Sequence, residues 1–281
     1  MRILKYASDL HLEHLDNIYK PKIIELWNFN TSEKDEYFLA LVGDIGNPFQ
    51  KNLELFLENV SSKYSLVFYI PGNHEYYNLD KNKQYDIEKF KKKLRKICYK
   101  FHNVVLMDNE SYDLEDIKFI GSTLWSHVPI ENSLQICRSI NDYHLIKKKN
   151  IFNELEKINY NDTNKWNKES IDFIKKELAN TNKPCIILTH HAPLFSDPIN
   201  NCYTADPIYI NSPNNFAFHN NLSEIITSPV ILWIYGHTHY NGTFKYNNIP
   251  ISTNQFGYYH EKIKFNSHSY YNLDDLIIKS L

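Results

Sequence analysis

The chain has 281 residues, of which 42% are hydrophobic and 23% are charged. This composition excludes wholesale disorder and is typical of a globular protein with a sizeable core. The 31 lysines and arginines nearly balance the 33 aspartates and glutamates, so the net charge of −2 argues against a protein that coats nucleic acid through a strongly basic face.

The sequence carries no signal for a membrane or secreted location. The longest apolar runs fall far short of the roughly 20 residues that a membrane helix needs, and no signal peptide is recognisable. The four cysteines have spacings that suit neither a zinc ribbon nor a disulfide framework. We therefore expect a cytoplasmic protein without a membrane partner, and its oligomeric state is left open.

Five short apolar runs are typical of strands that are buried on both faces of a sheet. In chain order they cover residues 3–7, 37–42, 66–70, 185–188 and 230–235. Apolar residues recur with a helical period over residues 49–63 and 86–100, and further strands are expected over residues 104–107 and 117–124. This order of elements predicts an α/β fold.

Residues 126–183 have a different character, because they are rich in lysine and asparagine and only weakly periodic. We expect a helical insertion here that caps the site, with helices near residues 146–158 and 170–178. The segment 197–221, rich in asparagine and proline, is predicted to be a long loop or lid. Because the sequence contains neither an internal repeat nor a clear linker, residues 1–281 are predicted to form a single domain.

Residues that can bind metal ions stand directly after each of the five predicted strands. In chain order these are Asp9 and His11, Asp44, Asn73 and His74, the pair His190 and His191, and finally His237 and His239. Four of the seven glycines stand beside these residues, at places where the backbone has few alternatives. Open α/β sheets place ligands at the carboxyl ends of such strands, so we expect one shared site.

The candidate ligands comprise two carboxylates, four imidazoles and one amide oxygen. They are Asp9, His11, Asp44, Asn73, His190, His237 and His239. This set is too large for one ion and suits two divalent cations, for which Mn, Fe and Zn are the candidates. Two such ions activate a bridging water and stabilise charge on a phosphoryl group. The set therefore predicts a dinuclear phosphoesterase in which Asp44 bridges the ions and His74 protonates the leaving alkoxide or holds a phosphate oxygen.

Five motifs in this order resemble those of the calcineurin-like metallophosphoesterases, over roughly residues 1–260. They stand as Asp9-Leu10-His11, Gly43-Asp44-Ile45-Gly46-Asn47, Gly72-Asn73-His74-Glu75, His190 and Gly236-His237-Thr238-His239. The resemblance implies a four-layer αββα sandwich with a dinuclear site at its rim. It also implies that His74 is the catalytic histidine and that the attacking group is a metal-bridging hydroxide.

The resemblance further implies how the ligands divide between the two ions. One ion would be bound by Asp9, His11, Asp44 and His239, and the other by Asp44, Asn73, His190 and His237. The family uses the first member of a pair such as His190 and His191, which leaves His191 in a supporting position. Asn47 stands where the family has an acid that steadies the catalytic histidine, so we expect the protonated form of His74 to be less favoured here.

Several substrates fit these residues, including both phosphate monoesters and diesters. A small phosphorylated substrate is the first expectation, and a nuclease or a cyclic-nucleotide phosphodiesterase is the alternative on the same site. The lysines of residues 86–100 are expected to form a solvated helix face, although they also fit a stripe that binds nucleic acid. A non-catalytic binding module on the same fold is the alternative of another class, and it predicts an empty or distorted metal site.

Aromatic residues offer one further candidate feature. A wall of four aromatic side chains would stack a base, although core or surface use is the simpler expectation in a chain with 15% aromatic residues. These residues are Trp125, Tyr203, Tyr258 and Tyr259.

Overall fold

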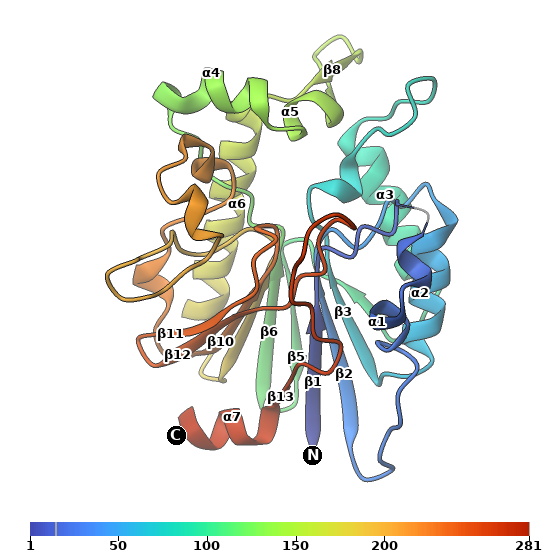
Figure 1. The fold of residues 1–281 in the computed structure, drawn as a ribbon, viewed down its shortest axis with the longest axis vertical. Coiled ribbons are helices and arrows are strands. Elements are labelled where there is room, and N and C mark those ends of the chain that lie inside the picture. Colours follow the sequence, from blue (N-terminus) through green and yellow to red (C-terminus); the bar gives the residue numbers. More distant parts are fainter. Residues whose placement is uncertain (15, 281) are drawn as a thin grey trace.

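Within residues 1–14 and 16–280, which the computed structural model describes, two large mixed sheets pack face to face (Figure 1). The first sheet, in the order β13-β1-β2-β3-β4, contains β1 (Arg2–Ala7), β2 (Glu36–Val42), β3 (Leu66–Ile70), β4 (Val104–Leu106) and β13 (Tyr270–Asn272). The second, in the order β11-β12-β10-β9-β6-β5, contains β5 (Glu110–Leu114), β6 (Ile117–Ser122), β9 (Cys185–Thr189), β10 (Val230–Tyr235), β11 (Thr243–Tyr246) and β12 (Ile249–Thr253). Every strand that the sequence predicted is confirmed.

Helices cover the outer faces of both sheets, and the result is the four-layer αββα sandwich that the resemblance implied. Helices α2 and α3 lie over the first sheet and α6 lies over the second (Figure 1). The helices are α1 (Pro21–Ile24), α2 (Lys51–Ser61), α3 (Ile87–Cys98), α4 (Ile130–Ser139), α5 (Asp142–Leu145), α6 (Tyr160–Ala179) and α7 (Leu273–Ser280). The helices predicted over residues 49–63 and 86–100 are thus confirmed as α2 and α3.

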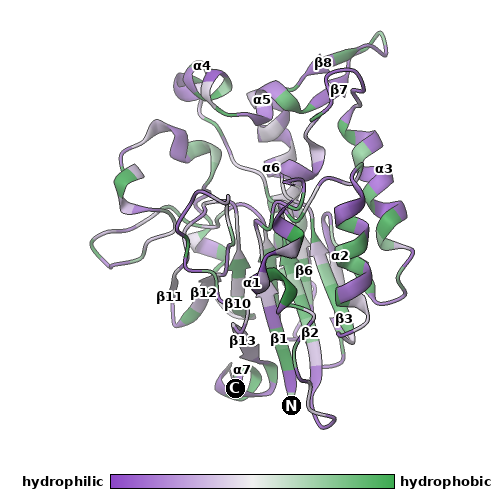
Figure 2. Ribbon diagram, turned by 45° about the vertical axis from the view of Figure 1, so that its right-hand side comes forward, coloured by the Kyte–Doolittle hydropathy of each residue, from purple (hydrophilic) through white to green (hydrophobic). Residues whose placement is uncertain are grey.

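An apolar core lies between the two sheets. Phe38 and Phe68 of the first sheet and Phe119, Ile186 and Leu232 of the second are fully buried in it. The rings of Phe68 and Phe119 stack across the interface with their centroids 4.2 Å apart. The strands in the middle of Figure 2 are largely hydrophobic. Helices α2 and α3, which lie beside them, carry both hydrophobic and hydrophilic residues. Burial of both strand faces explains why the strand sequences are continuous apolar runs.

Parallel strands place their carboxyl ends at one edge of the sandwich. β1 to β4 run parallel to one another, and so do β6, β9, β10 and β12. The residues that follow β1, β2, β3, β9 and β10 therefore meet at this edge, although they are far apart in the chain.

The segment of residues 126–183 lies partly beyond this edge and partly against a sheet. Helices α4 and α5 and a hairpin of β7 (Lys147–Lys149) and β8 (Leu155–Lys157) lie beyond the carboxyl ends of the strands (Figure 1). Helix α6 packs on the second sheet, with Ile174 in its core. The helix predicted over residues 170–178 is confirmed within α6.

The helix predicted over residues 146–158 is wrong, because these residues form the β7–β8 hairpin. The Asn150 side-chain oxygen accepts hydrogen bonds from the backbone N–H groups of Phe152 and Glu154, at 2.9 and 3.0 Å. Asn153 adopts a left-handed φ of 63°. Such local side-chain hydrogen bonds compete with helix formation and initiate a turn instead.

Two other segments bear on the predictions. Residues 197–221 form a long excursion with the short 3-10 helices η3 (Pro207–Tyr209) and η4 (Pro213–Ala217), in agreement with the predicted loop. Among the described residues, no helix combines the length and the apolarity that crossing a membrane requires.

Candidate metal centre

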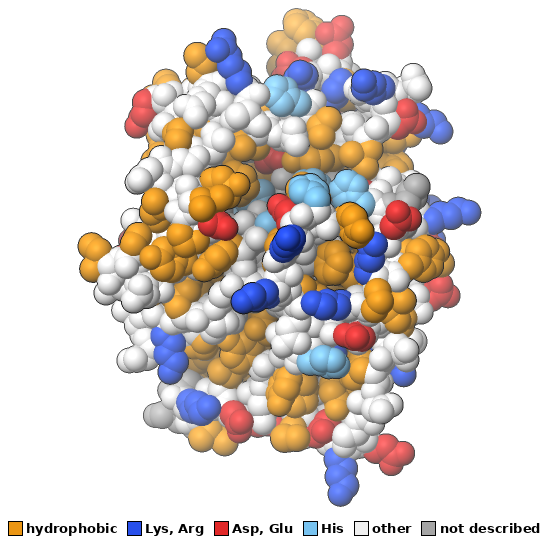
Figure 3. Space-filling model, in the orientation of Figure 1, with side chains coloured by type: hydrophobic (Ala, Val, Ile, Leu, Met, Phe, Trp, Pro, Cys, Tyr) orange, Lys and Arg blue, Asp and Glu red, His pale blue; other side chains and the backbone are white. Residues whose placement is uncertain are grey.

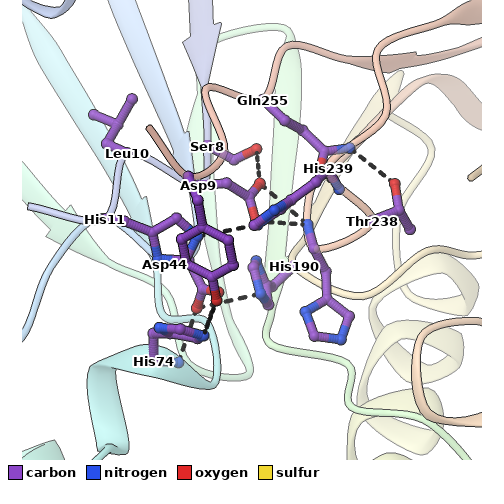
Figure 4. Close-up of polar contacts among 12 residues, drawn as sticks. Ser8, Asp9, Leu10, His11, Asp44, His74, His190, Thr238, His239 and Gln255 are labelled. Carbon is purple, nitrogen blue, oxygen red and sulfur yellow. Dashed lines mark hydrogen bonds and ion pairs between the residues drawn. The ribbon is translucent and has the colours of Figure 1, made fainter. Parts of the chain in front are cut away.

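Five of the seven predicted ligands occupy unusual backbone positions at strand ends. Their φ angles lie between 46° and 71°, a region that non-glycine residues rarely adopt. These residues are Asp9, His11, Asp44, His237 and His239. Hydrogen bonds between loops hold them, because the N–H of Asp9 donates to Gly43 O at 2.9 Å and that of His11 donates to Asp44 O at 3.0 Å. The side chains of Asp9, His11, Asp44 and His239 point toward a common centre (Figure 4).

The first donor set combines residues from both sheets. Nε2 of His11 lies 3.0 Å from Nε2 of His239, and Asp9 Oδ1 lies 3.4 Å from that same nitrogen of His239. The opposite nitrogen of each ring donates to a carboxylate, from His11 to Glu13 at 3.0 Å and from His239 to Glu261 at 2.6 Å. In the neutral imidazoles that a bound cation requires, each Nδ1 carries the ring proton, so both Nε2 atoms turn lone pairs toward each other and toward Asp9. Three acceptors that face one another fit a bound cation.

The second donor set follows the same logic. Nδ1 of His190 donates to Val42 O at 3.0 Å, and Nε2 lies 2.9 Å from Asn73 Oδ1 and 3.3 Å from Asp44 Oδ1. In the neutral ring that a bound cation requires, this Nε2 carries the lone pair. The amide nitrogen of Asn73 donates to Asp142 at 2.7 Å, which turns the amide oxygen toward His190. His237 places a ring nitrogen within 4.8 Å of ligand atoms of Asp44 and His190. These acceptors again converge without a donor between them.

Asp44 lies between the two sets. It shares one group of potential ligand atoms with His11 and His74, and another with His190 and His237. The structure gathers six of the seven predicted ligands, together with His74, into three overlapping groups of potential ligand atoms. The seventh, Asn73, places its Oδ1 2.9 Å from Nε2 of His190. On the face seen in Figure 3, histidine side chains gather at mid-height, where the surface is hollowed.

The centre attracts positive charge. Burial by itself would lower the pKa of His190, but Asp44 outweighs burial and raises that pKa to about 9. Burial likewise opposes protonation of His239, but hydrogen bonds to Asp9 and Glu261 raise its pKa to about 10. Two imidazoles that hold a proton this strongly, beside ionised carboxylates, are suited to divalent cations that replace those protons.

Two glycines are required by the close approach of the ligands. A Cβ atom on Gly43 would lie 2.1 Å from Nδ1 of His190, and one on Gly72 would lie 2.2 Å from Asp44 Oδ1. Gly43 also has a φ of 89°, which favours glycine. The glycines that precede the predicted ligands therefore mark real packing constraints.

His74 lies at the edge of the centre and is held by Glu13. Its Nδ1 donates to Glu13 Oε1 at 2.9 Å, and its Nε2 lies 3.9 Å from Asp44 Oδ2. Burial would lower the pKa of His74, but Asp44 and Glu13 raise it to about 9. The protonated form of His74 is thus favoured although residue 47 is an asparagine, because Asp44 and Glu13 supply the negative charge.

Asn47 and His191 have supporting roles that differ from one another. The Asn47 side chain donates to Tyr77 O at 2.9 Å and accepts from the Phe49 N–H at 3.0 Å, so it braces two loops and does not steady His74. His191 is buried, donates to Thr123 O at 3.1 Å, and packs on His237 with ring centroids 4.1 Å apart. The first member of the histidine pair faces the centre and the second supports it, as expected.

Sequence reasoning missed four carboxylates around the ligands. Glu13 and Glu261 orient histidine rings, Asp142 orients Asn73, and Glu75 holds two loops together. Glu75 stands within a motif and Glu13 stands two residues after one, and an acid so close to a predicted ligand is a usable signal. Asp142 and Glu261 lie outside every motif, and only the fold brings them to the centre.

Glu75 ties the loop after β2 to the loop after β3. Its buried carboxylate accepts backbone N–H groups of Asp44, Ile45, Gly46 and Gly72, at distances between 2.6 and 3.0 Å. It also accepts the Tyr69 hydroxyl at 2.9 Å. Burial and the charge of Asp44 raise the pKa of Glu75 to about 7.

Replacing Glu75 by glutamine is expected to destabilise the protein. The amide nitrogen of glutamine would face two N–H donors, so their hydrogen bonds would be lost in a buried place. We expect a loss of about 3 kcal/mol in the free energy of unfolding, measured by urea denaturation. Glu58→Gln on the exposed face of α2 is the matched control and should change stability little. Equal stability of the two variants would contradict the assigned role of Glu75.

A cleft of about 340 Å³ opens directly onto the centre. Residues 139–142, before and within α5, form one wall, and residues 205–219 of the long loop form another. The uncharged polar side chains that line it are Ser139, Asn141, Ser212, Asn214, Asn215 and Thr238. None of the described residues that line it is a lysine or an arginine.

The four predicted aromatic residues do not form one wall. Tyr258 lines the cleft, and Tyr259 is 77% exposed beside a neighbouring groove. Trp125 is buried in the core, where its ring packs on His191. Tyr203 does not line the cleft. Burial and chain direction, which sequence does not specify, separate these side chains.

Three of the seven basic residues in residues 86–100 form ion pairs. Lys91 pairs with Asp108 at 2.9 Å, Arg95 pairs with Glu110 at 3.0 Å, and Lys100 pairs with Glu54 at 2.6 Å. These ion pairs fit the expected solvated helix face.

Comparison with known proteins agrees with this geometry. The family described as calcineurin-like phosphoesterase matches residues 4–241. The chain is 56% identical to "Uncharacterized protein L509" of Acanthamoeba polyphaga mimivirus, over all of both chains. Its fold is similar to that of phosphopantetheinyl hydrolase (PptH) from Mycobacterium tuberculosis, with a TM-score of 0.68, 18% identity, and coverage of 92% of this chain and 90% of that one.

The family match covers most of the chain, and the fold and the grouped ligands agree with it. A non-catalytic module with a distorted metal site does not fit this arrangement. The chain therefore belongs to the calcineurin-like phosphoesterases and is a metal-dependent hydrolase of phosphate esters.

Proposed function

We propose that the protein binds two divalent cations and hydrolyses a small phosphorylated substrate in the cleft above them. The observation that carries this proposal is the convergence of acceptors described above, in which imidazole, carboxylate and amide lone pairs face one another in two adjoining groups. When bound, the two cations would supply a hydroxide at neutral pH and neutralise phosphoryl oxygens. Mn, Fe and Zn all suit nitrogen and oxygen ligands of this kind.

Side chains of the protein would bind the cations and supply the proton that hydrolysis needs. Asp44 would hold both cations, and Asp9, His11 and His239 complete one ligand group. Glu13 fixes the His74 ring through Nδ1, so that Nε2 faces the cleft. His74 is thereby placed to supply the proton that the leaving oxygen needs.

The shape and charge of the cleft favour a small substrate over a nucleic-acid strand. A volume of about 340 Å³ suits a compact phosphate ester with a neutral, hydrogen-bonding body. A strand would need basic side chains along its backbone, whereas no lysine or arginine is among the described residues that line the cleft. The four cysteines are free thiols, which supports our proposal of a cytoplasmic location.

A direct test strips the purified protein of metal and reloads it with Mn²⁺, Fe²⁺ or Zn²⁺. Bound metal is counted by plasma mass spectrometry, and turnover is followed with p-nitrophenyl phosphate, its bis ester, mononucleotides and cyclic nucleotides. We expect about two ions per chain and metal-dependent release of product. Absence of turnover with every metal and ester, or steep salt-dependent cleavage of nucleic acid alone, would contradict the proposal.

Asp142 gives a prediction about one ligand. Its Oδ1 accepts the Asn73 amide at 2.7 Å and the Tyr77 hydroxyl at 2.6 Å, and this contact fixes which way the amide points. Asp142→Asn removes that preference, so the affinity for the second ion should fall about 10- to 100-fold. Titration calorimetry measures it, with the exposed Asp172→Asn on α6 as control. Unchanged affinities for both ions would show that Asp142 does not orient Asn73.

A further inference from the structure

A loop near the carboxyl end of the chain completes the wall of the cleft, and it lies beyond residues 4–241 that the family match covers. The loop, residues 256–261, is anchored to the end of β1. The N–H of Phe256 donates to Ser8 O at 3.0 Å, and the N–H of Gly257 donates to Asp9 O at 2.9 Å. Gly257 has a φ of 75°, and a Cβ there would lie 2.1 Å from Ile263, so the turn requires glycine.

Glu261 couples this loop to the metal centre. One oxygen, Oε2, accepts the N–H of Tyr258 at 2.8 Å and Nδ1 of His239 at 2.6 Å. The same atom therefore fixes the backbone of Tyr258 and the ring of a predicted ligand. A loop tied at both its start and its end has a defined position over the centre.

This anchoring places the Tyr258 side chain against His74 and two predicted metal ligands. Its hydroxyl lies 3.1 Å from Nε2 of His74, the nitrogen that faces the cleft. Its ring stacks on His11 with centroids 4.5 Å apart and meets His239 edge-on at 4.7 Å. His74 and Tyr258 both line the cleft, so the hydroxyl and the ring nitrogen meet at its wall, where the leaving oxygen of a substrate would lie.

We propose that Tyr258 is a further catalytic residue, which passes the proton from His74 to the leaving oxygen; this rests on the proposed phosphoesterase function. As the bond between phosphorus and that oxygen breaks, its electron pair remains on the oxygen, which takes the phenol proton. The phenol oxygen takes the proton from His74 Nε2 in the same step. The new bond to phosphorus is formed by the oxygen of the attacking hydroxide. Tyr258 gives one proton and receives one, so the leaving oxygen gains the proton that His74 loses.

Leaving-group dependence tests this relay. Nitrophenolate leaves without a proton, whereas an alkoxide needs one. Tyr258→Phe should lower kcat about 100-fold for the methyl ester of whichever class wild type hydrolyses, and less than about 5-fold for the p-nitrophenyl ester. Metal content should equal that of wild type. Tyr259→Phe, at the exposed neighbouring residue, is the matched control and should leave both rates unchanged.

A double variant separates a relay from simple packing. If the two residues act as one unit, His74→Ala combined with Tyr258→Phe should be about as slow as His74→Ala alone. Equal losses on both esters, additive losses in the double variant, or loss of metal in Tyr258→Phe would each overturn the relay.

One measurement does not depend on turnover. In the metal-loaded protein, the ¹⁵N chemical shift of His74 Nε2 should move in Tyr258→Phe and stay constant in Tyr259→Phe. A shift that moves in neither variant overturns the contact. If the wild-type protein is inactive but the shift moves as expected, the contact between Tyr258 and His74 stands and the proposed phosphoesterase function is wrong.

Discussion

Asp44→Asn is expected to lose bound metal and to reduce turnover by at least about 1,000-fold. Asp44 is the one predicted ligand that shares ligand groups with residues of both sets, so its two oxygens can serve two cations. Asparagine keeps the size of the side chain but offers one oxygen and no charge. The negative charge that now opposes four imidazoles would be halved, because Asp9 alone would remain among the ligands.

Metal analysis and kinetics measure this effect together. We expect fewer than two ions per chain in Asp44→Asn, and activity that excess metal restores only in part. Asp275→Asn, at an exposed position of α7, serves as the control for the same chemical change. A variant that holds two ions and turns over like wild type would remove Asp44 from the bridging position.

His74→Ala is expected to retain both ions and to slow turnover by about 100- to 10,000-fold. The ring lies beside the centre, and its protonation is favoured because Asp44 and Glu13 raise its pKa to about 9 against the effect of burial. A raised pKa means that the acid form persists through neutral pH and is lost as the pH rises through about 9. Wild-type kcat should therefore fall on the alkaline side, and this limb should be absent in the variant.

The pH profile of kcat, measured at saturating metal, distinguishes this role from a structural one. His102→Ala, at an exposed surface position, is the control and should keep the wild-type profile. An alkaline limb that persists unchanged in His74→Ala would assign it to another group.

Local sequence was sufficient for the strands and for the ligands that follow them. A buried strand needs a continuous apolar run, and a ligand at its end needs a turn, so both signals lie within a few residues of each other. The same locality explains the error at residues 146–158, where Asn150 and Asn153 favour a turn over the weak helical period.

Short-range sequence patterns do not predict contacts between residues that are far apart in the chain. Asp142 meets Asn73 across 69 positions, and Glu13 meets His74 across 61. The motif alone draws attention to Asn47, whereas in the structure Glu13 and not residue 47 contacts the His74 ring. Only the packing of the loops decides which carboxylate fills that position.

The sequence by itself determined the fold class, the strand-end position of the site and the seven candidate ligands that lie there, because each depends on short-range patterns of apolar, glycine and polar residues. The tertiary structure alone decided which carboxylates orient those ligands, which side chains wall the cleft, and that Tyr258 rather than the other three aromatic residues reaches His74. These contacts depend on how separate loops cross at the sheet edge, and that crossing is set by the whole core rather than by any one segment.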